Sequence, residues 1–208
     1  KKPYFIAEIG SNFNQDLNTG LKLIDKAKSS GANAVKFQLF KANKLYPNNK
    51  KMFKIFKSIE LKKSLFKRFY FYAKKLNLDV SASTFDLESA RYLKKFNVDF
   101  HKIASSELTN YDLIEYLSKT NLPILLSTGM SDLQDVKNAV NICEKNNNTN
   151  IVIMQCGSDY PLKHKDVNLI NEKWYNHIKR CGIQCQISFN FISQKFDTIR
   201  TLPDDLCY

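Results

Sequence analysis

Val35-Lys36-Phe37-Gln38 is an apolar, strand-like run that carries polar side chains toward its end, and similar runs recur along the chain. Helix-like segments separate most of these runs. In a barrel of alternating strands and helices, all strand C-termini open onto the face that holds the active site. Polar groups gathered on that face would suit a small anion carrying phosphate. The six runs are Tyr4–Glu8, Val35–Gln38, Val80–Ser83, Lys102–Ser105, Ile124–Ser127 and Ile151–Cys156.

Composition indicates an ordinary globular domain. The chain has 208 residues, of which 43% are hydrophobic and 25% charged, and one domain is the default at this length. No apolar run approaches the roughly 18 residues of a membrane span. The N-terminal Lys1-Lys2-Pro3-Tyr4 leads into the first strand without a signal-peptide core. We therefore expect a cytoplasmic location.

The formal net charge of +12 raises the possibility of a nucleic-acid partner. The lysines are spread along the chain, however, and no basic run exceeds three residues. A generally positive field would also attract an anionic metabolite. The cysteines are irregularly spaced, and Cys181 and Cys185 lack the second pair or nearby histidine of a zinc site, so reduced thiols are expected.

Helix signals lie between the strands. Leu17, Leu21, Ile24 and Ala27 recur at helical spacing, and Gly31 stands where a C-cap glycine belongs. Asp86 and Asn110 are candidate N-caps. The sequence further predicts a helical stripe from Leu61 to Tyr72, a Ser131–Gln134 capping box, an irregular loop over 41–59, a surface turn over 146–148 and a seventh strand over 183–188.

Strand and helix alternate without hairpin signals, which favours parallel strands. Pattern alone leaves a doubly wound sheet and a closed barrel open. The segment from Glu8 to Asn12 holds a single glycine and no dinucleotide fingerprint. Polar groups lie at the ends of six strands, and not only at a single topological switch point. We therefore expect an α/β fold, namely a (β/α)₈ TIM barrel that is incomplete at its C-terminal end, with about seven strands covered.

Lys36 and Gln38 flank Phe37 on a strand, so both point to one face. They suit an exposed edge strand or, if the strand is buried, a polar site, since burial without partners is costly. Lys102 stands on a strand in the same way. The Ser105-Ser106-Glu107 and Ser127-Thr128-Gly129 segments place hydroxyls and backbone N–H groups before helices, as phosphate sites do.

Five ordered motifs together resemble the N-acetylneuraminate (sialic acid) synthase family, which includes legionaminate, pseudaminate and spore-coat polysaccharide synthases. The resemblance runs from about Tyr4 to Ser188. The motifs are Ala7–Asn12, Ala34–Gln38, Lys102–Glu107, Leu126–Met130 and Gln155–Pro161.

The resemblance implies a (β/α)₈ barrel that condenses phosphoenolpyruvate with an open-chain N-acetylated amino sugar and releases phosphate. It places Glu8 near the sugar carbonyl and Glu107 on the sugar side. Around the phosphoenolpyruvate anion and its phosphate it places Lys36, Gln38, Lys102, Ser105, Ser127 and Tyr160. Ser83 stands at a position where the family has a hydroxyl residue, often threonine, and Ser158 stands where it usually has asparagine. A divalent metal, Mn²⁺ or Mg²⁺, would polarise the aldehyde, and a homodimer of the family type is possible.

The resemblance breaks at two histidine positions, one of which binds the metal in the family. Phe13 stands where the family has histidine, and Asn190 in Ser188-Phe189-Asn190 stands where a metal-binding histidine is expected. We expect an incomplete synthase-like barrel over 1–188 and a divergent tail over 189–208. The second metal histidine and the antifreeze-like C-terminal domain would lie beyond the chain.

Two functional hypotheses follow from the resemblance. The first is a phosphoenolpyruvate-dependent synthase, and the second is a truncated, non-catalytic remnant that binds anions or a full-length partner. Retained phosphate-site residues beside missing metal ligands lead us to expect little turnover from this chain alone. A basic nucleic-acid-binding domain is a third hypothesis, which would require a clustered positive face.

Overall fold

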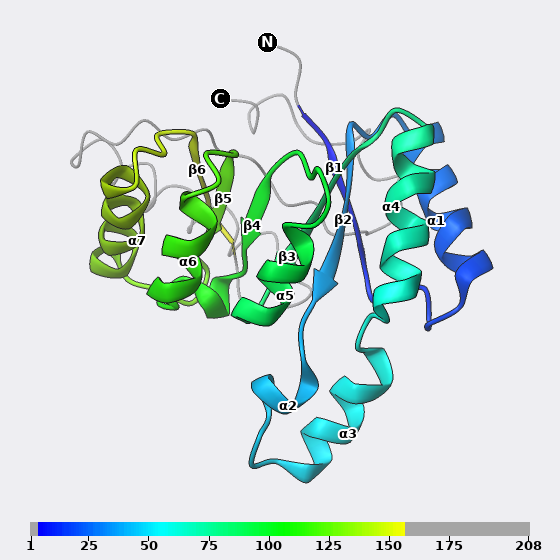
Figure 1. Cartoon of the computed structure of the whole chain (residues 1–208), viewed down its shortest axis with the longest axis horizontal. Coiled ribbons are helices and arrows are strands. Elements are labelled where there is room, and N and C mark those ends of the chain that lie inside the picture. The colour runs from blue at the N-terminus through cyan, green and yellow to red at the C-terminus, as the bar shows by residue number, and fades with distance from the viewer. Residues whose placement is uncertain (1–3, 157–208) are drawn as a thin grey trace, which may run out of the picture.

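The computed structural model describes residues 4–156, which form a parallel sheet of six strands with helices along it (Figure 1). The strand order is β1-β2-β3-β4-β5-β6, the order in which the strands occur in the chain. Right-handed crossovers between consecutive parallel strands place every helix on the same face. A sequential order therefore indicates a singly wound, barrel-type sheet rather than a doubly wound one. The strands are β1 Ile6–Gly10, β2 Ala34–Leu39, β3 Asp79–Thr84, β4 His101–Ile103, β5 Ile124–Ser127 and β6 Ile151–Met154.

The helices follow the predicted spacing in most places. Asp86 and Asn110 cap α5 and α6 as expected, accepting from the backbone N–H groups of Ser89 and Leu113. Gly31, with φ +83°, follows the last turn of α1. The helices are α1 Leu17–Ser29, α2 Ala42–Leu45, α3 Lys50–Ile59, α4 Lys63–Lys75, α5 Leu87–Leu93, the 3₁₀ turn η1 Ser105–Glu107, α6 Tyr111–Ser118 and α7 Leu133–Lys145.

The expected loop over 41–59 is wrong, because this stretch forms α2 and α3. Asn49 caps α3 by accepting from the Met52 N–H at 3.1 Å. The Phe56 ring packs against Phe40 and Tyr46, with centroid separations of 5.7 and 4.6 Å. Figure 1 shows α2 and α3 projecting beyond the carboxyl end of β2. Closely spaced lysines on the polar face of α3 hide this apolar spacing in the sequence.

The predicted capping box at Ser131 is also wrong. The cap of α7 is Asp132, whose carboxylate accepts from the Asp135 N–H at 2.9 Å while the Asp135 carboxylate accepts from the Asp132 N–H at 3.2 Å. Carboxylates are favoured over a serine hydroxyl here because the helix N-terminus carries partial positive charge. The same reciprocal pattern exists, shifted by one residue.

The turn over 146–148 is not wholly on the surface. Asn147 has the left-handed φ of 59° that makes the turn. Asn148, however, is buried, and its amide donates to the carbonyls of Ser118 at 3.2 Å and Leu122 at 2.9 Å. The side chain therefore ties its turn to the last residue of α6 and to the connection between α6 and β5.

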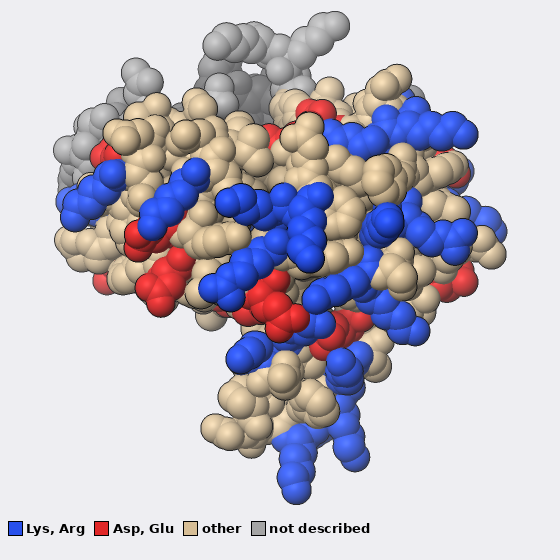
Figure 2. Space-filling view, in the orientation of Figure 1, with Lys and Arg blue, Asp and Glu red and all other residues tan. Residues whose placement is uncertain are grey.

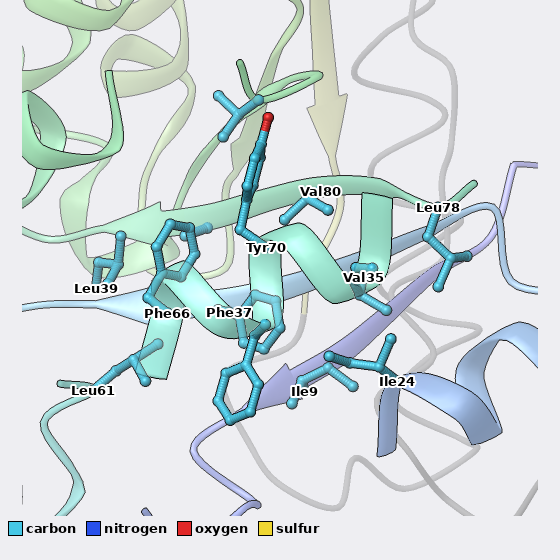
Figure 3. Close-up of a cluster of buried hydrophobic side chains, with 14 of the residues drawn as sticks. Ile9, Ile24, Val35, Phe37, Leu39, Leu61, Phe66, Tyr70, Leu78 and Val80 are labelled. Atoms are coloured by element: carbon cyan, nitrogen blue, oxygen red, sulfur yellow. The ribbon is translucent and has the colours of Figure 1, made fainter. Parts of the chain in front are cut away.

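The outer face of the sheet packs against the helices in an aromatic core (Figure 3). Phe37 of β2 stacks on Phe69 of α4, with ring centroids 5.5 Å apart, and meets Phe66 edge-on at 5.8 Å. Phe13 is fully buried and packs edge-on against Phe69 at 5.2 Å. Phe13, which departs from the family motif, is thus a core residue here.

The inner face of the sheet changes character along the strands. Toward the amino ends it is apolar, with Ala34, Phe100 and Leu125 in a small buried cluster that Met154, the last residue of β6, completes. Because side chains alternate across a strand, Lys36 follows Ala34 on this face, Lys102 follows Phe100 and Ser127 follows Leu125. The carboxyl ends therefore present a polar surface on an otherwise buried face. The predicted strand over 183–188 lies outside the described residues.

Candidate active site

Glu8, Lys36 and Ser83 meet at the carboxyl ends of the first three strands. Register pairs Glu8 with Lys36, and Gln38 with Ser83. The Lys36 ammonium forms an ion pair with Glu8 and donates to Ser83 Oγ at 2.9 Å. Lys36 is only 4% exposed and lies on a strand flanked on both sides, which excludes the edge-strand interpretation.

The Glu8 carboxylate uses only one of its oxygens in this pairing. Oε2 contacts Lys36, whereas Oε1 is buried without a hydrogen-bond partner among residues 4–156. A bulge in β1 lies between Glu8 and Gly10, where φ is +55°. A Cβ at position 10 would lie 3.3 Å from Oε1 and 3.9 Å from the Gln38 amide nitrogen. Glycine therefore keeps a side chain away from a carboxylate oxygen that has no partner among the described residues.

Lys102, Ser127 and Cys156 form a second group. Lys102 Nζ donates to the Ile103 carbonyl at 2.8 Å and to Ser127 Oγ. The Cys156 thiol donates to the same Ser127 oxygen at 3.2 Å. The sequence motifs assign Ser127 to the site, whereas Cys156 is expected only as a reduced thiol. The signal that could have found Cys156 is its alternation with Val152 and Met154, which continues the period of β6 by two residues.

Burial and, to a lesser extent, the charge of Lys36 together lower the pKa of Lys102 to about 7, while Cys156 and Glu8 oppose the shift. Lys102 is 4% exposed, and a buried ammonium without a carboxylate partner loses hydration that its neutral hydrogen-bond partners only partly replace. The two lysines thus belong to one electrostatic unit.

Ser105 joins the end of β4 to the segment after β5. Its hydroxyl accepts from the Gly129 N–H at 3.2 Å. A Cβ on Gly129 would lie 2.7 Å from the Cys156 carbonyl oxygen, so only glycine fits between the segments that follow β5 and β6. The Ser105 hydroxyl and the Cys156 carbonyl therefore both lie close to the Gly129 backbone.

The other predicted site residues have different outcomes. Glu107 lies on η1, where its carboxylate accepts from Asn110 Nδ2 at 2.9 Å and Ser106 Oγ at 3.2 Å, and within the described chain no polar contact joins it to either lysine. Gln38 is half-buried on β2 beside Gly10. Ser158, Tyr160 and Asn190 lie outside the described residues.

No metal site is formed by residues 4–156. This part of the chain holds no group of three or more His, Cys, Asp or Glu side chains that could bind an ion. His101 is buried on the outer face of β4, where its Nε2 lies 2.9 Å from Thr120 Oγ1, so it has a structural role. The described residues therefore do not by themselves fit the implied divalent cation.

Across the same residues, no helix has the length and apolarity needed to cross a membrane.

Comparison with known proteins identifies the family. The chain is 36% identical to the N,N'-diacetyllegionaminic acid synthase of Campylobacter jejuni over 185 residues, covering 81% of this chain and 55% of that synthase. It is 31% identical to the human N-acetylneuraminate-9-phosphate synthase, covering 80% of this chain and 50% of the enzyme. The chain spans about half the length of such curated relatives.

A solved structure shows the same fold. The N-acetylneuraminic acid synthetase of Leptospira borgpetersenii, crystallised with citrate, superposes with a TM-score of 0.81 at 30% identity. The match covers 90% of this chain and 65% of that one. The model of the NeuB family matches residues 23–181. This chain belongs to the NeuB family.

Proposed function

We propose that the protein to which this chain belongs condenses phosphoenolpyruvate with an N-acetylated amino sugar and releases phosphate. The observation that carries this proposal is the pair of buried lysines, Lys36 and Lys102, at the carboxyl ends of parallel strands. Only one carboxylate, Glu8, is ion-paired with them among the described residues. Burying a charge without a partner costs several kcal/mol, and an anionic ligand would offset that cost.

The residues would divide the work between two substrates. The ammonium groups of Lys36 and Lys102 would hold the phosphoenolpyruvate anion, assisted by Gln38 and the hydroxyls of Ser83, Ser105 and Ser127. As the enol carbon attacks the aldehyde, positive character develops at C2 of phosphoenolpyruvate and negative charge grows on the aldehyde oxygen. Pre-oriented donors in a dry site stabilise such charge better than water does.

Glu8 would face the amino sugar. Its Oε1 is buried and unpartnered in the described part of the chain, so it can accept from a sugar hydroxyl without breaking the ion pair to Lys36. Glu107, already bonded to Asn110, would contribute on the sugar side only after a rearrangement. Ser158 and Tyr160 remain proposed phosphate contacts on sequence resemblance.

The divalent cation, Mn²⁺ or Mg²⁺, stays in the proposal as a requirement to be tested. When bound, such an ion would polarise the sugar aldehyde. We assign no step to it, because the described residues form no group to hold it. A cytoplasmic location and a homodimer are parts of the same proposal.

Two alternatives make different predictions. A non-catalytic remnant would bind phosphoenolpyruvate through Lys36 and Lys102 without releasing phosphate. A nucleic-acid-binding domain would present a continuous basic patch. Figure 2 instead shows lysine and arginine side chains spread over this face with acidic side chains between them, and some of them pair, as Lys63 does with Glu88 at 3.3 Å.

The deciding experiment measures phosphate release and binding together. The purified chain is incubated with phosphoenolpyruvate, Mn²⁺ and a panel of N-acetylated hexosamines, and the products are identified by mass spectrometry. Release that requires both substrates supports the synthase, and saturable binding without release supports the remnant. Absence of phosphoenolpyruvate binding would contradict both. Lys119→Met serves as the matched control for substitution of Lys36 or Lys102, since Lys119 is an exposed lysine paired with Glu115.

A further inference from the structure

Lys102 is the buried lysine of the site that has no carboxylate partner among residues 4–156. Its Nζ bonds to two uncharged oxygens, the Ile103 carbonyl and Ser127 Oγ. The carboxylate of the site, Glu8, is engaged with Lys36. Among the described residues the other ionisable groups that influence Lys102 are Lys36 on β2, Glu8 on β1 and Cys156 after β6. β3 and β5 contribute the uncharged Ser83 and Ser127 at this end.

We propose that Lys102 is mostly a neutral amine in the ligand-free protein and takes up a proton when an anion binds, so that phosphoenolpyruvate binding is coupled to proton uptake. The inference rests on the proposed function for the identity of the ligand. Its basis is the charge arrangement: burial and the neighbouring Lys36 ammonium both disfavour a second positive charge. An arriving anion reverses that balance, because an opposite charge within about 4 to 6 Å favours the ammonium.

The ionisation of Lys102 agrees with this charge arrangement. The pKa of Lys102 is lowered to about 7, chiefly by burial and then by Lys36. At pH 8 roughly 90% of the free protein would therefore carry a neutral amine. The phosphate of phosphoenolpyruvate is already doubly ionised at that pH, since the second pKa of a phosphate ester is about 6. Protons taken up at pH 8 would thus go to the protein.

The coupling fixes the direction of the pH dependence. The bound state holds one more proton than the free state above the pKa of free Lys102. Affinity therefore falls by up to about tenfold per pH unit as the pH rises above 7. Below pH 7 Lys102 is already protonated in the free protein, so this contribution levels off.

Calorimetric titration of the 208-residue chain at pH 8 tests the proposal. In buffers with different ionisation enthalpies, the slope of observed enthalpy against buffer enthalpy gives the protons taken up, and about 0.9 is expected. Sulfate is titrated in parallel because it does not change ionisation in this range. Phosphoenolpyruvate binding with no uptake would overturn the inference and leave the proposed function standing. Proton uptake on sulfate binding, without any binding of phosphoenolpyruvate, would support the inference about Lys102 and contradict the proposed function. Absence of binding of either anion would overturn both.

Variants assign the proton to a residue. Lys102→Met should abolish uptake, and uptake that persists in this variant would overturn the assignment. Lys36→Met removes the repelling charge and leaves Glu8 to Lys102, so Lys102 should already be protonated and uptake at pH 8 should fall. Lys119→Met, at an exposed position, should match the wild type. The wild-type slope tests the proposal by itself, so the proposal can be overturned even if a variant fails to fold.

Discussion

Glu8 pairs with Lys36, and this buried ion pair links the first two strands at their carboxyl ends. Removing one partner of a buried pair leaves the other charge unpaired, which costs about 3 to 5 kcal/mol. Glu8→Gln keeps the shape but removes the charge, so urea denaturation should show a loss of this size. Glu115→Gln, which breaks the exposed pair to Lys119, should change stability by no more than about 1 kcal/mol. Equal effects of the two substitutions would contradict the buried pairing.

The second prediction concerns the packing of α1 against α4. A Cβ on Gly20 would lie 2.2 Å from Cζ of Phe69, so Gly20→Ala should destabilise the fold by about 1 to 3 kcal/mol through overpacking. Phe69→Leu removes the ring atoms that clash. The double variant should therefore be more stable than the sum of the two single effects predicts. Strict additivity in thermal or urea unfolding would count against this close approach.

The third prediction is a loss of stability in acid caused by His101. Thr120 Oγ1 donates to the Leu117 carbonyl, so it accepts from His101 Nε2–H, and the buried Nδ1 has no partner in the described region. Burial lowers the pKa of His101 from 6.5 to about 4. The unfolded chain therefore gains a proton near pH 6.5 while the folded protein does not.

Stability should accordingly fall as the pH drops from about 6.5 to 4, by up to about 3 kcal/mol, with no further loss from this residue below that range. His101→Gln keeps an N–H donor for Thr120 but does not titrate. Urea midpoints measured from pH 7 to 4 should show a shallower decline for this variant. Parallel curves for the two proteins would rule out His101 as the cause.

Residues with strong local signals could be placed from the sequence. Lys36 and Lys102 each interrupt an apolar strand, and side chains alternate between the two faces of a strand. In a parallel barrel this places both lysines on the face that the strand C-termini share. Asp86 and Asn110 cap helices through bonds to residues three positions on. Residues that depend on distant partners could not be placed. Asn148 is buried where its amide donates to the Ser118 and Leu122 carbonyls, 30 and 26 residues away in the chain, and Cys156 joins the site through Ser127.

The helix α3 shows a different limit of the sequence. Its apolar residues follow helical spacing, but interspersed lysines and a short partner helix made the segment resemble a loop. Glu107 lies on η1, and the partners of its carboxylate among the described residues are its chain neighbours Ser106 and Asn110. The family resemblance implies a role for Glu107 on the sugar side. To take that role, its carboxylate would have to release the Asn110 amide.

A crystal structure of the chain with phosphoenolpyruvate bound tests the central claim most directly. The claim is that Lys36 and Lys102 together form the anion site at the carboxyl ends of the strands. We expect the phosphate or carboxylate oxygens of the ligand within hydrogen-bonding distance of both Nζ atoms, with Glu8 still paired to Lys36. Phosphoenolpyruvate bound away from both lysines, with these side chains unchanged, would contradict the account.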